Sequence, residues 1–203
     1  MVRSDLGGSG VMFTLDTESG FDKVVLINAA WGLGENVVQG SVTPDEYEVY
    51  KPLLADPALS PLVEKKRGAK ERKMIYAGAE GGETKNVPTS KAERAAFVLG
   101  DAEILDLARM ACTIEDHYGQ PMDMEWARDG EDGTLYIVQA RPETVRSRDS
   151  ANQVERYLLQ ERGELICEGR SIGHRIGKGA VKVINDLSEM ASVQQGDVLV
   201  TDM

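Results

Sequence analysis

Apolar and polar residues in the first half of the chain form short patterns that are typical of β-strands. Residues 10–14 and the nearly continuous apolar run at residues 24–30 predict buried segments. The second fits a central strand or a buried stretch of helix, because a short apolar run alone does not separate the two. Alternation at 46–50, and weaker alternation at 73–76, predicts half-buried strands.

Helical signals follow in the middle of the chain. Ser90-Lys-Ala-Glu93 has the form of a capping box, in which serine and glutamate each bond the other's backbone N–H. Apolar residues recur at helical spacing between 101 and 118, and Gly119 is a natural end for this helix. Two short apolar segments at 181–184 and 198–200 predict further strands. These signals together predict an α+β fold.

The most informative pattern is a pair of alternating segments on either side of a Gly- and Asp-rich loop at residues 128–133. Such a pair predicts a β-hairpin. If the loop is centred near residue 132, Asp123 is opposite Arg141. Glu125 is then opposite Gln139. Because side chains alternate along a strand, both carboxylates lie on one face and the neighbouring apolar residues lie on the other.

The four polar residues of this hairpin have a chemistry that suits a phosphate-bearing ligand. Carboxylate and amide oxygens bind Mg²⁺, which keeps several waters and takes its other ligands from substrate phosphates. The Arg141 guanidinium offers planar donors to phosphoryl oxygens. Two alternatives are a surface hairpin with one ion pair, and a glycosidase-like carboxylate pair. The second is disfavoured because Asp123 and Glu125 are two positions apart on one strand.

Glycine-rich turns form a second group of candidates. Gly32, Gly34 and Gly40 follow the apolar run, where backbone N–H groups at a helix start favour anions. The spacing is neither that of a P-loop nor that of a dinucleotide-binding fingerprint, so a plain tight turn is the alternative. The turn at residues 7–10 has the same two interpretations. His117, near a helix end, is interpreted as structural.

Composition narrows the class of protein. The chain has 203 residues and a formal net charge of −11, which argues against a broad nucleic-acid interface. Apolar residues make up 41% of the chain, which is enough for a packed core. Two distant cysteines favour a reducing compartment. No apolar run is long enough for a membrane span, and no signal peptide is found at the start, so we expect a cytoplasmic protein.

The chain shows one polar boundary. Residues 143–152 contain almost nothing apolar, which predicts a linker between a domain at 1–142 and an incomplete one at 153–203. The first domain starts directly with a strand pattern, and the chain stops just after another. We therefore expect the sequence to be a piece of a longer protein.

Several stretches, taken together, resemble a known family: residues 1–5, 10–20, 32–40, 123–126, 137–144, 173–177 and 196–203. This combination is similar to the phosphoenolpyruvate synthase (pyruvate, water dikinase) family over essentially the whole chain. The resemblance implies the C-terminal part of an ATP-grasp nucleotide-binding domain, followed by the start of a swivelling phosphohistidine domain. In that family ATP phosphorylates a carrier histidine, AMP and phosphate leave, and the phosphoryl group passes to pyruvate.

The resemblance also implies roles for individual residues. Glu125 and Gln139 would hold Mg²⁺ or ATP phosphates with Asp123 in support, and Gln139 and Arg141 would serve the phosphoryl transfer. The implied nucleotide contacts are Met1, Val2, Gly10, Thr14, Gly32, Gly34 and Glu35. Met1 and Val2 match the hinge whose backbone meets adenine.

The chain departs from the family in one important respect. Neither His117 nor His174 lies in the Gly-Gly-x-Thr-x-His context of the carrier histidine. We therefore expect no phosphoenolpyruvate synthesis, and reduced or absent nucleotide affinity, from this chain alone. The resemblance implies pyruvate as a partner of the full-length enzyme, and a homodimer formed through a domain missing here. The alternatives are a related dikinase or antibiotic phosphotransferase, and a nucleotide-binding module without catalysis.

Overall fold

The computed structural model describes residues 2–56, 58–78, 83–143, 161, 176–184 and 186–201. The chain divides into two compact units, Met1–Asn152 and Gln153–Met203, and each is described by itself. In these described ranges no helix has the length and apolar character that a membrane crossing requires.

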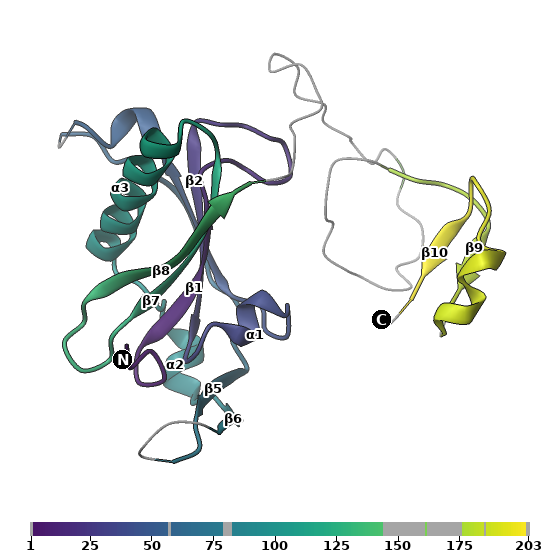
Figure 1. Cartoon of the computed structure of the whole chain (residues 1–203), viewed down its shortest axis with the longest axis horizontal. Coiled ribbons are helices and arrows are strands. Elements are labelled where there is room, and N and C mark those ends of the chain that lie inside the picture. Colours follow the sequence, from purple (N-terminus) through teal and green to yellow (C-terminus); the bar gives the residue numbers. More distant parts are fainter. Residues whose placement is uncertain are drawn as a thin grey trace. The chain divides into compact units, whose positions relative to one another are not determined.

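A six-stranded antiparallel sheet forms the centre of the first unit (Figure 1). The order of its strands is β4-β3-β2-β1-β7-β8. The strands are β1 (Gly8–Phe13), β2 (Val24–Trp31), β3 (Asp45–Tyr50), β4 (Leu62–Lys66), β7 (Met122–Arg128) and β8 (Leu135–Pro142). The apolar run at 24–30 is therefore a strand, and the strands predicted at 10–14 and 46–50 are confirmed.

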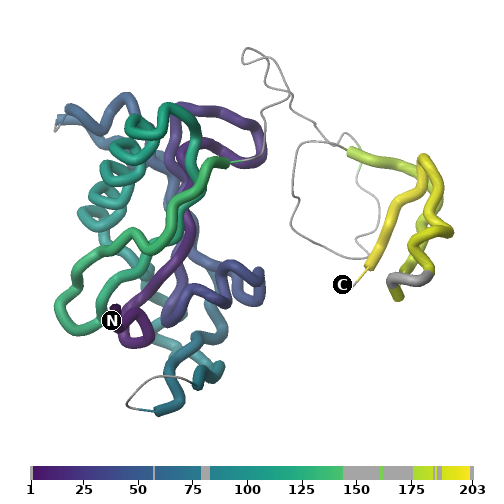
Figure 2. The backbone as a smooth tube through the Cα atoms, in the orientation of Figure 1, coloured from purple at the N-terminus to yellow at the C-terminus, as the bar shows by residue number. Residues whose placement is uncertain are grey.

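The remaining elements of this unit are short apart from one helix. They are α1 (Glu35–Val38), the 3₁₀ turn η1 (Lys51–Leu53), β5 (Arg72–Tyr76), β6 (Thr84–Pro88), α2 (Lys91–Ala95) and α3 (Asp101–Tyr118). Strands β5 and β6 form a separate hairpin that extends from the end of the sheet near α1 (Figure 2). The capping box is confirmed, because Ser90 Oγ accepts from Glu93 N and Glu93 Oε2 accepts from Ser90 N.

Helix α3 covers one face of the sheet, which we call the α3 face. Its buried residues Ile104, Leu107, Ala108 and Ala111 pack in one core with alternate strand residues such as Ile27 and Met124. The helix ends as predicted at Gly119, whose left-handed φ of 66° suits glycine. The intervening strand residues point to the opposite side, which we call the far face, and these include Val11, Asn28 and Glu125.

The second unit contains two short strands and a 3₁₀ turn. Strands β9 (Val181–Val183) and β10 (Val198–Val200) pair in parallel, and η2 (Leu187–Ser192) lies between them in sequence. The strands predicted at 181–184 and 198–200 are thus confirmed, although Ile184 follows β9 rather than belonging to it. Most of the predicted linker at 143–152, and His174, lie outside the described residues.

Candidate functional site

The β7–β8 hairpin brings the four predicted polar residues together. Asp123 pairs with Arg141 and Glu125 pairs with Gln139, as the sequence predicted. The register then shifts at a β-bulge, so that Trp126 is opposite Ile137. Without the shift, Ile137 would be turned away from Trp126; with it, Ile137 packs against the core on the α3 face. The bulge therefore lets β8 keep its polar residues on one side of the sheet and place the apolar Ile137 on the other.

Asp123 and Arg141 form a directed ion pair across this hairpin. Nε and Nη2 of Arg141 both donate to Asp123 Oδ2, at 2.8 and 2.7 Å. Hydrogen bonding to Asp123 raises the pKa of the Arg141 guanidinium, a group that is charged in any protein environment. The Asp123 side chain is 12% exposed and that of Arg141 is 67% exposed. Asp123 thus anchors a guanidinium that still presents free N–H groups to solvent.

Glu125 and Gln139 are the uncommitted members of the patch. Among the described residues no hydrogen bond engages the Glu125 carboxylate or the Gln139 amide. The described part of the chain also has no cluster of three His, Cys, Asp or Glu side chains that would enclose a metal ion. One carboxylate and one amide oxygen, beside an already paired Asp123, fit a hard cation that keeps waters and shares phosphate ligands, as Mg²⁺ does.

The far face continues from this patch across the central strands. Val11 of β1 pairs with Glu125, and Asn28 of β2 pairs with Glu46 of β3. The register that sets Ser9 opposite Ala30 and Met12 opposite Ile27 places Val11 opposite Asn28. A row of polar side chains interrupted only by Val11 therefore crosses the sheet from β8 to β3.

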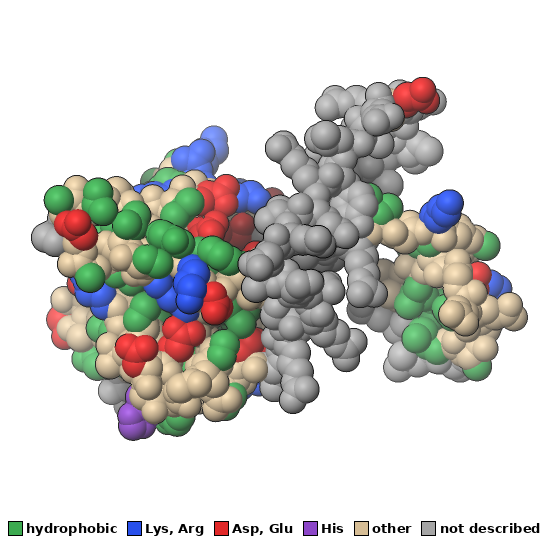
Figure 3. Space-filling model, turned by 90° about the horizontal axis from the view of Figure 1, so that it is seen from above, with side chains coloured by type: hydrophobic (Ala, Val, Ile, Leu, Met, Phe, Trp, Pro, Cys, Tyr) green, Lys and Arg blue, Asp and Glu red, His purple; other side chains and the backbone are tan. Residues whose placement is uncertain are grey.

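The far face is acidic toward its β3–β4 side. Burial raises the pKa of Glu48, and the nearby charges of Asp16 and Glu64 raise it further. Lys66 Nζ lies 3.7 Å from Glu46 Oε2 and offsets part of this charge. In the space-filling view of Figure 3, acidic side chains are interspersed with basic and apolar ones on the visible side of the first unit.

The Gly32–Gly34 turn lies at one end of the far face. Gly32 has φ 85°, and a Cβ there would lie 2.4 Å from Met74 O. Leu33 N donates to that same carbonyl at 2.9 Å, so β5 closes over the turn. Ser9 Oγ donates to Gly32 O at 2.6 Å. The turn is thus held against β1, with exposed Glu35 at the start of α1 just beyond it.

The described start of the chain lies at this same end. Arg3 N donates to Asp129 Oδ2 at 3.0 Å, and Gly130 N donates to Arg3 O at 3.1 Å. These bonds tie the segment after Val2 to the loop between β7 and β8. Met1, the other predicted hinge residue, lies outside the described residues.

Gly10 and Thr14 are not brought to the polar patch. A Cβ on Gly10 would lie 1.8 Å from Asn28 O and 3.1 Å from Trp126 Nε1. The missing side chain allows the Trp126 indole to cross β1 and donate to Asn28 O at 3.2 Å. Thr14 is fully buried, and its Oγ1 accepts from Met122 N at 2.8 Å. Packing and backbone pairing account for both residues without a ligand.

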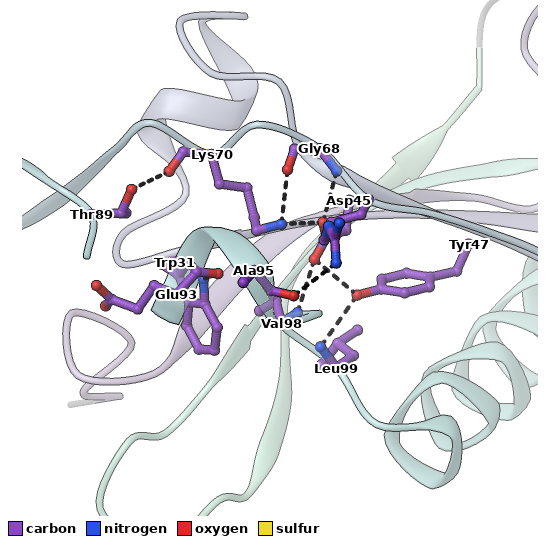
Figure 4. A network of polar contacts seen from close by, with 11 residues as sticks. Trp31, Asp45, Tyr47, Gly68, Lys70, Thr89, Glu93, Ala95, Val98 and Leu99 are labelled. Carbon is purple, nitrogen blue, oxygen red and sulfur yellow. Dashed lines mark hydrogen bonds and ion pairs between the residues drawn. The ribbon is translucent and has the colours of Figure 1, made fainter. Parts of the chain in front are cut away.

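A buried polar network on the α3 face was not foreseen (Figure 4). Asp45 and Lys70 form an ion pair whose side chains are both 0% exposed. The Asp45 carboxylate also accepts from Gly68 N at 2.9 Å and Val98 N at 2.8 Å. Tyr47 OH donates to it as well, and burial raises the pKa of this phenol. Apart from Tyr47, the partners of Asp45 lie 23 or more residues away in the sequence, so no local pattern could reveal the network.

The sequence patterns also did not single out Asn28 as a candidate site residue, although the sequence contains a signal for it. It is a polar residue inside the apolar run of β2. Its Oδ1 is the one buried side-chain polar atom without a partner among the described residues. Since buried polar atoms are normally bonded, this atom calls for an explanation. His117, by contrast, makes an edge contact with the Tyr118 ring, which suits the structural role expected of it.

Comparisons with known proteins agree with the family resemblance. Residues 1–162 match the family described as "Pyruvate phosphate dikinase, AMP/ATP-binding domain". The chain is 59% identical to "Phosphoenolpyruvate synthase" of Pseudomonas aeruginosa (strain UCBPP-PA14), and 56% identical to the protein of that name from Escherichia coli (strain K12). Both alignments cover 100% of this chain and 26% of the relative. The chain therefore spans about a quarter of the length of these curated relatives.

Proposed function

The chain belongs to the pyruvate phosphate dikinase AMP/ATP-binding domain family, and on that premise we propose that it supplies the Mg²⁺- and phosphate-binding part of an ATP site. The observation that carries the proposal is the pairing of Glu125 with Gln139 and of Asp123 with Arg141 on adjacent strands of the far face. Two uncommitted oxygen ligands and one anchored guanidinium are thereby held within neighbouring positions of a rigid sheet.

Each residue has a distinct role in this proposal. The Glu125 carboxylate and the Gln139 amide oxygen hold Mg²⁺, which when bound neutralises phosphate charge. Arg141 donates to phosphoryl oxygens, and Asp123 fixes the orientation of the guanidinium. Phosphoryl transfer depends mainly on positioning and charge stabilisation, and these groups provide both.

The order of features along the strands supports one direction for the nucleotide. Val2 and the Gly32–Gly34 turn lie at the β1 start, Glu125 lies midway along β7, and the Asp123–Arg141 pair lies further on. In the proposed arrangement adenine lies toward Val2 and the phosphates toward Arg141. Gly10 and Thr14 have no part in it.

For the longer protein we propose the reaction that the name of its relatives describes, the synthesis of phosphoenolpyruvate. Residues 1–142 would be the C-terminal part of an ATP-grasp domain, and residues 153–203 the start of a swivelling phosphohistidine domain. ATP would phosphorylate a histidine carrier, and pyruvate would receive the phosphoryl group, in a homodimeric enzyme. The relatives named phosphoenolpyruvate synthase support this. A different acceptor on the same ATP site is the alternative.

Nucleotide titration of the purified chain tests the proposal. We expect Mg-ATP to shift backbone amide resonances of β7 and β8 with weak affinity, and EDTA to abolish the shifts. The Glu125→Gln variant keeps the side-chain shape but loses the charge, and should weaken binding about tenfold or more. Glu131→Gln is the matched control, because Glu131 lies exposed in the loop of the same hairpin.

Two results would contradict the proposal. Equal affinity of wild type and Glu125→Gln would remove Glu125 from the site. Pyruvate-dependent formation of AMP by the chain alone, measured in a coupled assay, would show that the transfer machinery is complete without the rest of the longer protein.

A further inference from the structure

Asn28 occupies an unusual position in the middle of the sheet. It lies in β2, whose neighbouring residues Ile27 and Ala29 are fully buried. Asparagine is depleted in strands, because it neither packs well nor favours extended backbone. An apolar residue at this place would serve the fold better, so the position is a candidate for a function that overrides stability.

Within the described part of the chain, the Asn28 amide is unpaired at both ends. Its Oδ1 is buried and has no partner, and no hydrogen bond of the described residues engages its Nδ2. Asn36 shows what a structural asparagine looks like here: Nδ2 donates to Asn86 Oδ1 at 2.7 Å, and Oδ1 accepts from Ser41 Oγ at 2.9 Å.

Carboxylates lie on both sides of Asn28 in its row across the sheet. Across the sheet Glu46 is opposite it on β3, and Glu125 lies beyond Val11 at two strand spacings, roughly 10 Å. A lysine here would form ion pairs with these carboxylates. A neutral amide offers donors without that attraction, and the Nδ2 of Asn28 is not among the enclosed atoms without a partner. Together with the Gln139 amide, it adds a donor to a row that otherwise supplies acceptor oxygens.

We propose that Asn28 is a further phosphate-contact residue, whose Nδ2 donates to an oxygen of the triphosphate held at Glu125; this rests on the proposed function. A phosphate oxygen is favoured over the base or ribose because Asn28 shares its row with Glu125. The Val2 and Gly32 end of the sheet lies further along β1. The enclosed end of the amide is the acceptor Oδ1, which a phosphate oxygen cannot satisfy, so the contact is made by Nδ2, the end that is not enclosed.

The proposal has a signature that a structural role does not share. Replacing Asn28 by the similarly sized leucine removes an unpaired buried oxygen, so the free protein should become more stable. The same change removes a ligand contact, so Mg-ATP binding should weaken. A structural asparagine such as Asn36 should show the opposite stability effect, because Asn36→Leu leaves Asn86 and Ser41 without the hydrogen bonds that they make to the Asn36 side chain.

Three measurements on the whole chain test this. The melting temperature of Asn28→Leu should exceed that of wild type by a few degrees, and that of Asn36→Leu should fall. Mg-ATP affinity of Asn28→Leu, by NMR titration, should be about tenfold weaker. The Asn28 side-chain NH₂ resonance, identified by its absence from Asn28→Leu, should shift during titration of wild type.

The outcomes separate the two proposals. If wild type binds and Glu125→Gln weakens binding while Asn28→Leu does not, the Asn28 inference alone is overturned. A melting temperature of Asn28→Leu that falls as far as that of Asn36→Leu also overturns it, because the amide is then bonded in solution. If wild type does not bind Mg-ATP, or Glu125→Gln binds as well as wild type, the proposed function fails and the Asn28 inference fails with it.

Discussion

The two faces of the six-stranded sheet treat polar groups in opposite ways. On the α3 face, Asp45 and Lys70 are fully enclosed, and the carboxylate accepts from several further donors. On the far face, Asp123 is bonded to Arg141, but Glu125 and Gln139 make no side-chain hydrogen bond within the described part of the chain. Polar atoms of the Asp45–Lys70 network complete the fold, whereas the Glu125 and Gln139 side chains have no hydrogen-bond partner among the described residues.

The two ion pairs, one on each face, also differ in how much they contribute to the stability of the fold. A fully enclosed charge is tolerated only while its partner is present, so the Asp45–Lys70 pair couples distant segments of chain to β3. The Asp123–Arg141 pair has a guanidinium largely in water, where an ion pair contributes little to stability. Its value lies in orienting Arg141. Similar chemistry therefore serves stability on one face and positioning on the other.

Breaking the enclosed pair should have the largest effect. Lys70→Met leaves the Asp45 carboxylate buried without its counter-charge, and should lower the free energy of unfolding by about 3–5 kcal/mol. Urea unfolding followed by circular dichroism measures this. Arg141→Met is the control on the far face, and its unfolding midpoint should stay close to that of wild type. Equal losses in the two variants would erase the distinction between the faces.

A second test concerns the contact between the strands beneath Trp126. Gly10→Ala places a methyl group 1.8 Å from the position of Asn28 O, so β1 and β2 must separate or the indole must move. We expect a loss of roughly 1–3 kcal/mol or more in the free energy of unfolding. Gly78→Ala is the control, because a Cβ there meets nothing within 4 Å. A Gly10→Ala protein as stable as the control would show that the strand spacing adapts freely.

The β7–β8 hairpin shows what short-range pattern can predict. Alternation and a Gly/Asp loop are local features, and together they gave the correct partners for Asp123 and Glu125. The bulge was not predicted, because it arises when the Ile137 side chain must reach a core built from other segments. Local patterns set which strands pair, and the tertiary core then adjusts their register.

Gly10 and Asp45 show where sequence patterns are insufficient. A glycine in a strand signals a close approach, and whether a ligand or another side chain approaches depends on its face and neighbours. At Gly10 the Trp126 indole is that neighbour. Asp45 meets Lys70 only through the path of the chain between β3 and β5, and no spacing rule encodes that path. The unpaired Oδ1 of Asn28 becomes visible only when the surrounding described residues have been placed.

The smallest expected effect is a pair of opposite pH dependences, one from Glu48 on the far face and one from Glu93 of α2. Burial raises the pKa of Glu48 above its ordinary value of 4.5, and Asp16 and Glu64 add to this. Burial also opposes ionisation of Glu93, but hydrogen bonds from Lys73 and Ser90 outweigh it and hold the pKa of Glu93 below 4.5. Ionisation of Glu48 therefore costs stability, whereas ionisation of Glu93 contributes it.

Glutamine variants should show these signs directly. Glu48→Gln should be more stable than wild type at pH 7, and the difference should vanish as the pH falls through the raised pKa toward 4.5. Glu93→Gln keeps the capping hydrogen bond but loses the charge, so it should be less stable at pH 7. That deficit should shrink as the pH falls from 4.5 through the lowered pKa. Thermal unfolding at several pH values measures both, and parallel curves for the two variants would contradict the assignment of opposite environments to these carboxylates.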